Sequence, residues 1–353
     1  MSGSSLDGVD IVFASFESKG PEWRYTMHTT ACIPYEAGLK KRLQEADGLS
    51  AFDYMQLHAD YGKYLGNILK AFIHTNELDY KVQLIAVHSH TVFHEPQKGF
   101  THQLGDGAAI AAITGIPVIA DLRSMDIALG GEGAPLVPMG EKKLFSDHQL
   151  FLNIGGIANI GVHGEKVIGF DVCPANSILN LLAEKAGSTY DDKGMMAKRG
   201  KVNHSLLTEL NGLAYYQQPY PKSLSNQFGL DIITPILAKY SDSIPDVLCT
   251  YTEHIAMQIH HALNPFTDSS DTGSAQLMIT GGGAFNDYLI ERIQHHLPSI
   301  NIHLPEKEVI EYKEALIMAL LGILRWREEP TVLSSVTGAS AESIGGAIWS
   351  GHL

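Results

Sequence analysis

The chain has 353 residues, of which 25 are Lys or Arg and 39 are Asp or Glu, so its formal net charge is −14. The length and the 44% of hydrophobic residues are those of a globular protein with roughly two or three domains or one duplicated fold. The few, scattered basic residues argue against a general nucleic-acid binder, and the longest apolar run, residues 315–324, is too short for a membrane helix.

In the first half of the chain, short β-branched runs predict strands and longer amphipathic stretches predict helices. A Gly-Pro turn at residues 20–21 joins the first two runs into a hairpin, and Asp106 is placed to cap a helix. The expected strands cover residues 9–16, 24–32, 82–87 and 118–121, and the expected helices cover residues 35–44, 50–75 and 108–114.

The second half repeats this alternation, with glycine turns between strands. Asn286 is placed to cap a helix, and residues 345–346 lie in a tail that the pattern does not place. The expected strands cover residues 149–153, 157–161, 167–171, 276–280 and 300–304, and the expected helices cover residues 175–186, 288–296 and 312–327. Strands that alternate with helices indicate an α/β fold.

A glycine turn that feeds an apolar strand occurs near the start of each half, at residues 3–16 and 155–161, which suggests an internal duplication. We therefore expect an amino-terminal lobe over residues 1–147 and a carboxy-terminal lobe over residues 148–353, with a cleft between them. Clefts between lobes are common ligand sites.

Three glycine-rich turns near strand ends are candidate phosphate-binding sites. Backbone N–H groups and hydroxyls in such a turn can hold a phosphate, and a nearby carboxylate, here Asp7, can hold Mg²⁺. Each turn alone is more typical of a solvent-exposed loop. Together they suggest a nucleotide held between two lobes, although the chain has neither a Walker A lysine motif nor a strand-linked GxGxxG turn. The turns are Gly3-Ser4-Ser5-Leu6-Asp7-Gly8, Gly155-Gly156 and Gly281-Gly282-Gly283.

Asp171 stands at the expected end of a strand, from which its carboxylate can project into a cleft as a general base. The alternative role of Asp171 is the N-cap of the helix that follows. Cys173 is not expected to be a nucleophile, because no histidine partner is identifiable and Pro174 follows it.

Two further polar clusters have more than one interpretation. The spacing of His88, His90 and His94 is one that metal ligands can adopt, but no carboxylate lies in a confirming position, so substrate hydrogen bonding or packing is favoured. The charged residues 121–126 fit either sugar recognition or an ion-pair network, and the glycine-rich residues 130–138 are typical of a loop that lines a site.

Several segments, in order along essentially the whole chain, resemble the motifs of one family. They are MSGSSLDGVD at residue 1, HSHT at 88, LGDG at 104, ADLRSMD at 120, GGEGAPLVP at 130, NIGGIAN at 153 and VTGAS at 336. By these motifs the chain resembles the anhydro-N-acetylmuramic acid kinases. The resemblance implies the actin-like, hexokinase-like ATPase fold with a duplicated ribonuclease-H-like core. It also implies the substrate 1,6-anhydro-N-acetylmuramic acid, from peptidoglycan turnover.

The same resemblance implies roles for individual residues. Asp171 would be the base that activates water against the anomeric carbon, while the anhydro oxygen takes the γ-phosphoryl group of ATP, giving N-acetylmuramic acid 6-phosphate and ADP. The ATP phosphate loop would consist of Gly3, Ser4, Ser5, Leu6, Asp7, Gly8, Val9 and Asp10. The sugar-side residues would be His90, Arg123, Asp126 and Glu314. The resemblance further implies a homodimer.

The chain departs from the family pattern in two segments. The family's Asp-Thr-Gly-Pro-Gly-Asn is Asp171-Val172-Cys173-Pro174-Ala175-Asn176 here, and its Lys-Ser-Thr-Gly-Arg-Glu is Lys222-Ser223-Leu224-Ser225-Asn226-Gln227. Two alternatives therefore stay open beside the anhydro-sugar kinase. One is a kinase of the same fold that acts on another amino sugar, and the other is a nucleotide-binding regulator that has lost turnover.

The start of the chain and its cysteines complete the sequence-based expectations. Family members usually have an apolar strand before the MSG motif, so we expect further apolar, strand-like residues upstream of Met1. Three well-separated cysteines and the lack of a signal-peptide core predict a cytoplasmic protein.

Overall fold

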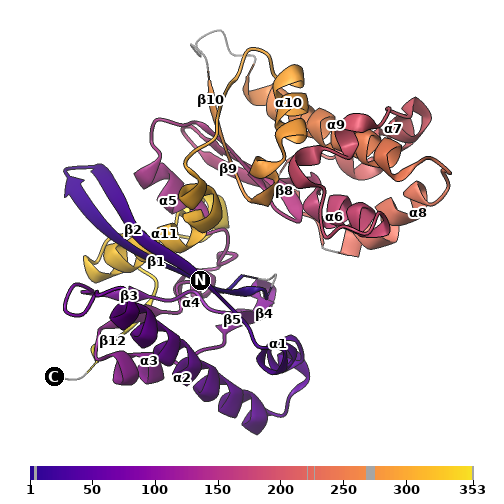
Figure 1. Ribbon diagram of the computed structural model, residues 1–353. Helices are drawn as coiled ribbons and strands as arrows, with labels where there is room; N and C mark the ends of the chain where they lie inside the picture. The colour runs from indigo at the N-terminus through magenta and orange to yellow at the C-terminus, as the bar shows by residue number, and fades with distance from the viewer. Residues whose placement is uncertain (4–5, 221, 226, 268–274, 352–353) are drawn as a thin grey trace. The chain divides into compact units, whose positions relative to one another are not determined.

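The computed structural model (Figure 1) describes residues 1–3, 6–220, 222–225, 227–267 and 275–351. The chain divides into two compact units, unit 1 with Met1–Ser146 and Tyr312–Leu353, and unit 2 with Asp147–Glu311. This division after Ser146 differs by one residue from the boundary expected between residues 147 and 148, and residues 312–353, expected in the carboxy-terminal lobe, belong to unit 1. The reason is strand β12 (Ala347–Trp349), which pairs antiparallel with β6 (Val118–Ala120).

Unit 2 is built on a five-stranded sheet in the order β11-β10-β7-β8-β9. Strand β7 is central, with β8 antiparallel on one side and β10 parallel on the other. Three antiparallel strands followed by two parallel ones form the strand order of a ribonuclease-H-like core, as the resemblance implies. The strands are β7 (Leu150–Ile154), β8 (Ile157–His163), β9 (Val167–Pro174), β10 (Gln276–Thr280) and β11 (Asn301–His303).

Helices cover this sheet and share one apolar core with it. The core includes Leu152 from β7, Ile279 from β10 and Ile255 from α9, each 0% exposed. Asn286 caps α10 as expected, accepting a hydrogen bond from the Leu289 N–H at 3.0 Å. The helices are α6 (Asn176–Lys185), α7 (His204–Asn211), α8 (Thr234–Leu237), α9 (Ile244–Leu263) and α10 (Asp287–His296).

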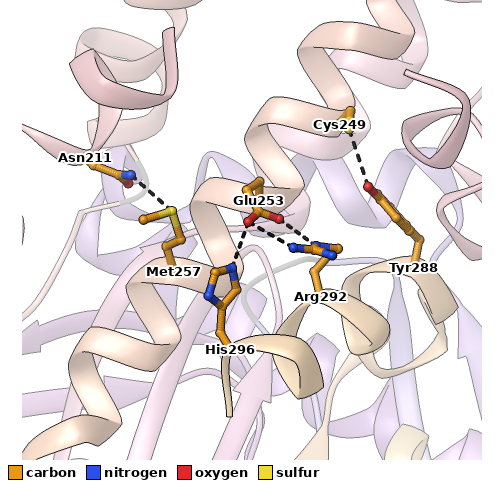
Figure 2. Close-up of polar contacts among 7 residues, drawn as sticks. All are labelled: Asn211, Cys249, Glu253, Met257, Tyr288, Arg292 and His296. Atoms are coloured by element: carbon orange, nitrogen blue, oxygen red, sulfur yellow. Dashed lines mark hydrogen bonds and ion pairs between the residues drawn. The ribbon is translucent and has the colours of Figure 1, made fainter. Parts of the chain in front are cut away.

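Helices α9 and α10 are also joined by polar contacts (Figure 2). The Arg292 Nε donates to Glu253 Oε2 at 2.7 Å, and its second nitrogen, NH2, donates to Glu253 Oε1 at 3.2 Å. The His296 ring lies 2.8 Å from the same Oε1, and the Tyr288 hydroxyl lies 3.4 Å from the Cys249 sulfur. These contacts connect two helices of the unit 2 core and include none of the expected site residues.

Unit 1 contains the expected hairpin and a second, smaller sheet. Strands β1 (Gly8–Lys19) and β2 (Glu22–Pro34) pair antiparallel. Strand β3 (Ile85–Ala86) pairs parallel with β6, and β12 completes the order β12-β6-β3. A two-stranded hairpin of β4 (Thr91–Glu95) and β5 (Phe100–Gln103) was not expected from the sequence.

Helices α1, α2 and α3 of unit 1 pack with these strands around a second apolar core. Asp106 caps α3 as expected, because its side chain accepts a hydrogen bond from the Ala108 N–H at 2.9 Å. The helices are α1 (Ala37–Gln44), α2 (Ala51–Thr75), α3 (Gly107–Thr114), α4 (Ser124–Ala128), α5 (Val137–Leu144), α12 (Ser334–Thr337) and α11 (Lys307–Trp326), which begins in unit 2.

The α/β class predicted from the sequence is confirmed. None of the helices within the described ranges has the length and hydropathy that crossing a membrane requires.

Candidate active site

Two of the expected phosphate-binding turns meet at one edge of the unit 2 sheet. Parallel strands β7 and β10 are neighbours, with Asn153 opposite Thr280, so the turns that follow them lie side by side. A Cβ atom on Gly281, whose φ is +82°, would lie 2.7 Å from both Asn153 Oδ1 and the Ile154 carbonyl oxygen. Only glycine fits this approach without a shift of the neighbouring chain. The structure therefore brings Gly155, Gly156 and Gly281–283 together.

The start of α6 completes this edge. The backbone N–H of Ala175 donates to the Gly156 carbonyl at 2.7 Å, and that of Asn176 donates to the Gly155 carbonyl at 3.0 Å. The Asn176 side chain donates to the Ile154 carbonyl at 3.1 Å. These bonds fix the Gly155-Gly156 turn against the amino end of α6.

Asp171 lies within β9 rather than at its end. The strand continues to Pro174, and the N-cap of α6 is Ala175, so the capping role considered for Asp171 is wrong. The ladder between β8 and β9 has a bulge here, since Ala158 faces Cys173 while Asn159 faces Asp171. Bulges of this kind redirect side chains and are common beside active sites.

The Asp171 carboxylate is half-buried and is held from one side. Its Oδ2 accepts a hydrogen bond from the Leu224 N–H at 2.9 Å. Burial raises the pKa of Asp171 above its ordinary value, and the Leu224 N–H opposes this shift in part. A carboxylate with a raised pKa is a stronger base than an exposed one, which suits proton abstraction from water.

The neighbouring Cys173 thiol is 0% exposed. Burial raises its pKa well above the ordinary value, which favours the protonated thiol over the nucleophilic thiolate. The sequence-based expectation for Cys173 agrees with this environment.

The two segments that depart from the family pattern lie next to each other. The Asp171 N–H donates to the Lys222 carbonyl at 3.0 Å, and the Leu224 N–H binds the Asp171 side chain. The Tyr215 hydroxyl donates to the Asp171 carbonyl at 2.7 Å, and Lys222 Nζ lies 4.6 Å from the centre of the Tyr215 ring. Residues 222–224 and Tyr215 thus position the strand that carries the base. Asn226, in the same departure, lies outside the described residues.

In unit 1, four of the sequence motifs are joined through hydrogen bonds around Arg123. One guanidinium nitrogen of Arg123 donates to the Gly133 carbonyl at 2.9 Å, and another lies 2.9 Å from His88 Nε2. Asp126 accepts from the Gly133 N–H and from the Thr337 hydroxyl, each at 2.7 Å. The segments HSHT, ADLRSMD, GGEGAPLVP and VTGAS therefore form one connected structure.

These bonds indicate different roles for Arg123 and Asp126. Asp126 is 0% exposed, and both of its oxygens are bonded to protein groups, so it positions the 131–133 loop. Arg123 keeps its buried Nε without a hydrogen-bond partner among the described residues. A buried unpartnered donor is costly, which marks Arg123 as a group that a ligand could satisfy. A direct sugar contact of Asp126 stays a prediction.

Glu314 lies close to Arg123 and to the start of the chain. It is accessible to solvent, yet desolvation by the surrounding protein raises its pKa, and the charges of Asp10, Arg123 and the Met1 ammonium also act on it. Burial lowers the pKa of Arg123 to about 10, and Glu314 opposes that shift. Arg123 and Glu314, two of the expected sugar-side residues, are thus electrostatically coupled.

The two histidines of the HSHT segment are neutral groups. Burial lowers the pKa of His88 well below its ordinary value, and Arg123 lowers it further. Burial also lowers the pKa of His90, which is partly exposed. From the sequence, His88 was considered only together with His90 and His94, as a metal ligand, a substrate hydrogen-bonding group or a packing group, and its role as the partner of Arg123 was not foreseen.

The loop at residues 3–10 is only partly described, because Ser4 and Ser5 lie outside the described residues. Leu6 and Val9 are 6% and 4% exposed and belong to the unit 1 core, so only their backbone groups are available to a nucleotide. Gly8 fits closely, since a Cβ atom there would lie 2.6 Å from the Ile33 carbonyl oxygen. Asp7 is exposed, and burial raises the pKa of the partly buried Asp10.

Among the described residues, no group of three or more His, Cys, Asp or Glu side chains could hold a metal ion by itself. Mg²⁺ in phosphoryl-transfer sites is commonly bound by one or two carboxylates together with the substrate phosphates. The exposed carboxylate of Asp7 fits that need, because it belongs to the expected phosphate loop and is accessible.

Comparisons with known proteins cover the whole chain. The family model described as anhydro-N-acetylmuramic acid kinase matches residues 1–351. The anhydro-N-acetylmuramic acid kinase of Vibrio cholerae is 36% identical, with 99% of this chain and 96% of that protein aligned. The protein of the same name from Acinetobacter baylyi is 33% identical, with 99% and 98% aligned. One similar solved structure is the activator of the 2-hydroxyisocaproyl-CoA dehydratase from Clostridium difficile with bound ADPNP. The alignment covers 60% of this chain and 68% of the activator's chain, at 14% identity and a TM-score of 0.38.

Proposed function

The chain belongs to the anhydro-N-acetylmuramic acid kinase family, and from this premise we propose that it converts 1,6-anhydro-N-acetylmuramic acid, water and ATP into N-acetylmuramic acid 6-phosphate and ADP. The observation that carries the proposal is the match of the family model to residues 1–351. The half-buried carboxylate of Asp171 supplies the base that the reaction needs.

The reaction couples two bond changes. Asp171 accepts a proton from water, whose oxygen bonds to the anomeric carbon as the bond from that carbon to the anhydro oxygen breaks. The freed oxygen then bonds to the γ-phosphorus of ATP, and ADP leaves with the electron pair of the broken P–O bond. Water attack needs a base of raised pKa that is held in a fixed direction. The Leu224 N–H bound to Asp171 Oδ2 provides that direction.

The remaining residues bind and orient the substrates. Arg123, fixed by Gly133 and His88, offers an unpartnered Nε to the sugar, and Glu314 accepts hydrogen bonds from hydroxyl groups. The turns at Gly155-Gly156 and Gly281–283 offer backbone N–H groups to the nucleotide phosphates. Asp7, together with the phosphates, would hold Mg²⁺, and the ion would supply positive charge against the charge that develops on the transferred group.

The test is product analysis in water labelled with heavy oxygen. The protein is incubated with ATP, Mg²⁺ and the anhydro sugar, and mass spectrometry should show a product with both an added water and an added phosphoryl group. The heavy oxygen should be found at the anomeric carbon and not in the phosphate. A phosphorylated product with the ring intact would favour a kinase for another amino sugar, and nucleotide binding without turnover on a panel of sugars would favour a regulator.

For the base, Asp171→Asn should remove nearly all turnover and leave ATP affinity within a few-fold, because the carboxylate acts on water and not on the nucleotide. Asp287→Asn is the matched control, since it makes the same change at an exposed position of unit 2. Melting temperatures of both variants should stay close to that of the parent. An unchanged kcat for Asp171→Asn would show that another group is the base.

The proposal extends to assembly and location. We propose a cytoplasmic homodimer. The resemblance implies a dimer, and the proposed reaction consumes ATP, which the cytoplasm supplies. Sedimentation at several concentrations tests the dimer, and cell fractionation tests the location.

A further inference from the structure

A buried ion pair that includes none of the expected site residues joins two helices of unit 1. The Lys313 ammonium of α11 donates to Glu141 Oε1 of α5 at 2.8 Å, and each side chain is only 5% exposed. By comparison, the side chains of the Arg292–Glu253 pair are 23% and 12% exposed. Burial removes water from both charges of such a pair, and an apolar pair of similar size is often at least as stable. Stability alone therefore does not account for Lys313 and Glu141.

The pair lies where α5 and α11 approach each other closely (Figure 1). A Cβ atom on Gly140 would lie 2.4 Å from Cγ2 of Ile317, which is one helical turn after Lys313. Ile317 is 0% exposed, so little water reaches the two charges. Charges in such surroundings are weakly screened, and their attraction depends on the distance between them. The ion pair therefore favours one position of α11 along α5.

Lys313 is directly followed by Glu314, the expected sugar-side carboxylate of α11. Consecutive helix residues point about 100° apart, so Lys313 is directed at α5 while Glu314 is exposed. On the side of α5, Glu141 follows the segment whose Gly133 carbonyl accepts a hydrogen bond from Arg123. The ion pair thus connects the helix that carries Glu314 to the segment that holds Arg123.

The Lys313 ammonium also acts on Glu314 through its charge. Burial raises the pKa of Glu314, and Lys313 is the largest influence that opposes this shift. Asp10 of β1 raises the same pKa further, whereas Arg123 and the Met1 ammonium lower it. An ionised carboxylate accepts stronger hydrogen bonds than a protonated one does. Lys313 therefore favours the form of Glu314 that binds hydroxyl groups more tightly.

We propose that Lys313, fixed by Glu141, is a positioning residue for Glu314, because its buried ammonium defines where α11 holds that carboxylate and places a positive charge beside it. Neither Lys313 nor Glu141 touches the sugar, and both act through Glu314. The inference rests on the proposed function, in which Glu314 binds the anhydro sugar. It extends that function from the groups that contact the substrate to an ion pair that the sequence motifs did not indicate.

The test replaces the ion pair by an apolar pair of similar size, Lys313→Met with Glu141→Leu. This double variant should melt no more than about 5 °C below the parent, since exchanging a buried ion pair for apolar side chains is commonly neutral or stabilising. Its KM for the anhydro sugar should nevertheless rise at least about fivefold, while its KM for ATP stays within about twofold. Lys198→Met with Glu291→Leu is the matched control, because it removes an exposed pair of the same residue types in unit 2, and it should leave both KM values unchanged.

A titration without substrate separates this inference from the proposed function. NMR of isotope-labelled glutamate carboxyl groups follows Glu314, whose signal is identified by its loss in Glu314→Gln. Because a positive charge has been removed, the midpoint for Glu314 should lie at least about one pH unit higher in the double variant than in the parent. A parent that does not turn over the anhydro sugar would overturn the proposed function, and the titration would still decide whether Lys313 acts on Glu314.

A second double variant, Lys313→Gln with Glu141→Gln, replaces the first if the apolar pair does not fold. It removes the same charges and keeps a hydrogen bond between two neutral side chains, so the same changes in the sugar KM and in the titration of Glu314 are expected. An unchanged sugar KM or an unchanged titration in a folded double variant would overturn the proposal. A rise of both KM values together with a fall in melting temperature would also overturn it, since the pair would then be purely structural.

Discussion

At the residue scale, Asp171 and Arg123 are both ionisable groups whose surroundings alter their proton affinity, but the causes differ. Asp171 has a raised pKa because burial outweighs one backbone N–H, which suits a base. Arg123 has a lowered pKa because it is buried beside the neutral His88, and Glu314 keeps it charged. A buried cation held by two fixed acceptors and left with a free donor is a group prepared to bind a ligand.

Arg123→Lys should raise the KM for the sugar at least about tenfold and leave the KM for ATP within about twofold. The planar guanidinium of Arg123 contacts the Gly133 carbonyl and His88 Nε2 at the same time and has a third donor, Nε. A lysine ammonium cannot reproduce this arrangement. Steady-state kinetics with each substrate varied in turn measures the effect. Arg42→Lys is the matched control, because Arg42 forms an exposed pair with Asp60. A fall in melting temperature with no change in the sugar KM would mean that Arg123 is purely structural.

At the scale of elements, the chain after β7 lies so close to the turn after β10 that position 281 of this turn requires glycine. Gly281→Ala should lower the free energy of unfolding by about 1–3 kcal/mol and weaken ATP binding, since it forces an L residue into positive φ against the Ile154 carbonyl. Gly164→Ala is the control, because Gly164 has no positive φ and the nearest atom to an added Cβ, the Lys166 carbonyl oxygen, would lie 3.9 Å away. Urea unfolding and nucleotide titration measure both variants. Equal effects of the two substitutions would contradict the geometric argument.

The contact between α9 and α10 (Figure 2) should contribute to stability in a pH-dependent way. Burial raises the pKa of Glu253, but hydrogen bonds from Arg292 and His296 outweigh it, so that the pKa lies below its ordinary value. A carboxylate with a lowered pKa stabilises the fold above its unfolded pKa, and this stability is lost as the pH falls through the folded value.

Arg292→Ala should therefore lower the free energy of unfolding by about 1–3 kcal/mol near pH 7, because it removes two charge-assisted hydrogen bonds from a mostly buried carboxylate. The difference from the parent should shrink in acid as Glu253 becomes protonated. Lys198→Ala, which removes an exposed pair with Glu291, should cost less than about 1 kcal/mol. Urea unfolding at several pH values gives both numbers. If the destabilisation by Arg292→Ala stayed constant down to pH values below the ordinary pKa of glutamate, the variant would have lost packing and not a charge interaction.

Most strands and the helix caps could be predicted from the sequence because their signals are local. Strand β10 has the limits that its apolar run predicts, and Asp106 and Asn286 cap helices as their side chains favour. The long helix α9, most of whose residues are buried in the unit 2 core, was not predicted from the sequence. Strand β12 was missed because its place depends on β6, which is remote in the sequence.

Some residues of the candidate site could likewise be predicted from the sequence and others could not. The residue types and motif order indicated Asp171, Arg123 and the glycine turns. The groups that position Asp171 were not indicated, because Tyr215 lies in no recognised motif and Leu224 acts through its backbone N–H, which any residue type can supply. Only the folded chain shows that the two departures from the family pattern lie together, with residues 222–224 beside β9.

At the scale of the whole molecule, the chain returns to its first unit at the end. After unit 2, helix α11, α12 and β12 add to unit 1, and the Trp349 ring lies directly over Gly107, where a Cβ atom would be 2.6 Å from it. The carboxy-terminal residues therefore belong to the same core as the amino-terminal ones. Unit 1 is thus formed from two separate segments of the chain, whereas unit 2 is one continuous segment.

Trp349→Ala should consequently destabilise unit 1 by about 2–3 kcal/mol, since it removes a large, partly buried ring from the edge of the unit 1 core. Hydrogen exchange should show faster exchange in β6 than in the parent, with a much smaller change in β7. Ile279→Ala, in the unit 2 core, is the reciprocal variant and should accelerate exchange in β7 more than in β6. If Trp349→Ala instead accelerated exchange equally in β6 and β7, the two compact units would unfold as one cooperative body, and residues 312–353 would stabilise the whole chain rather than unit 1.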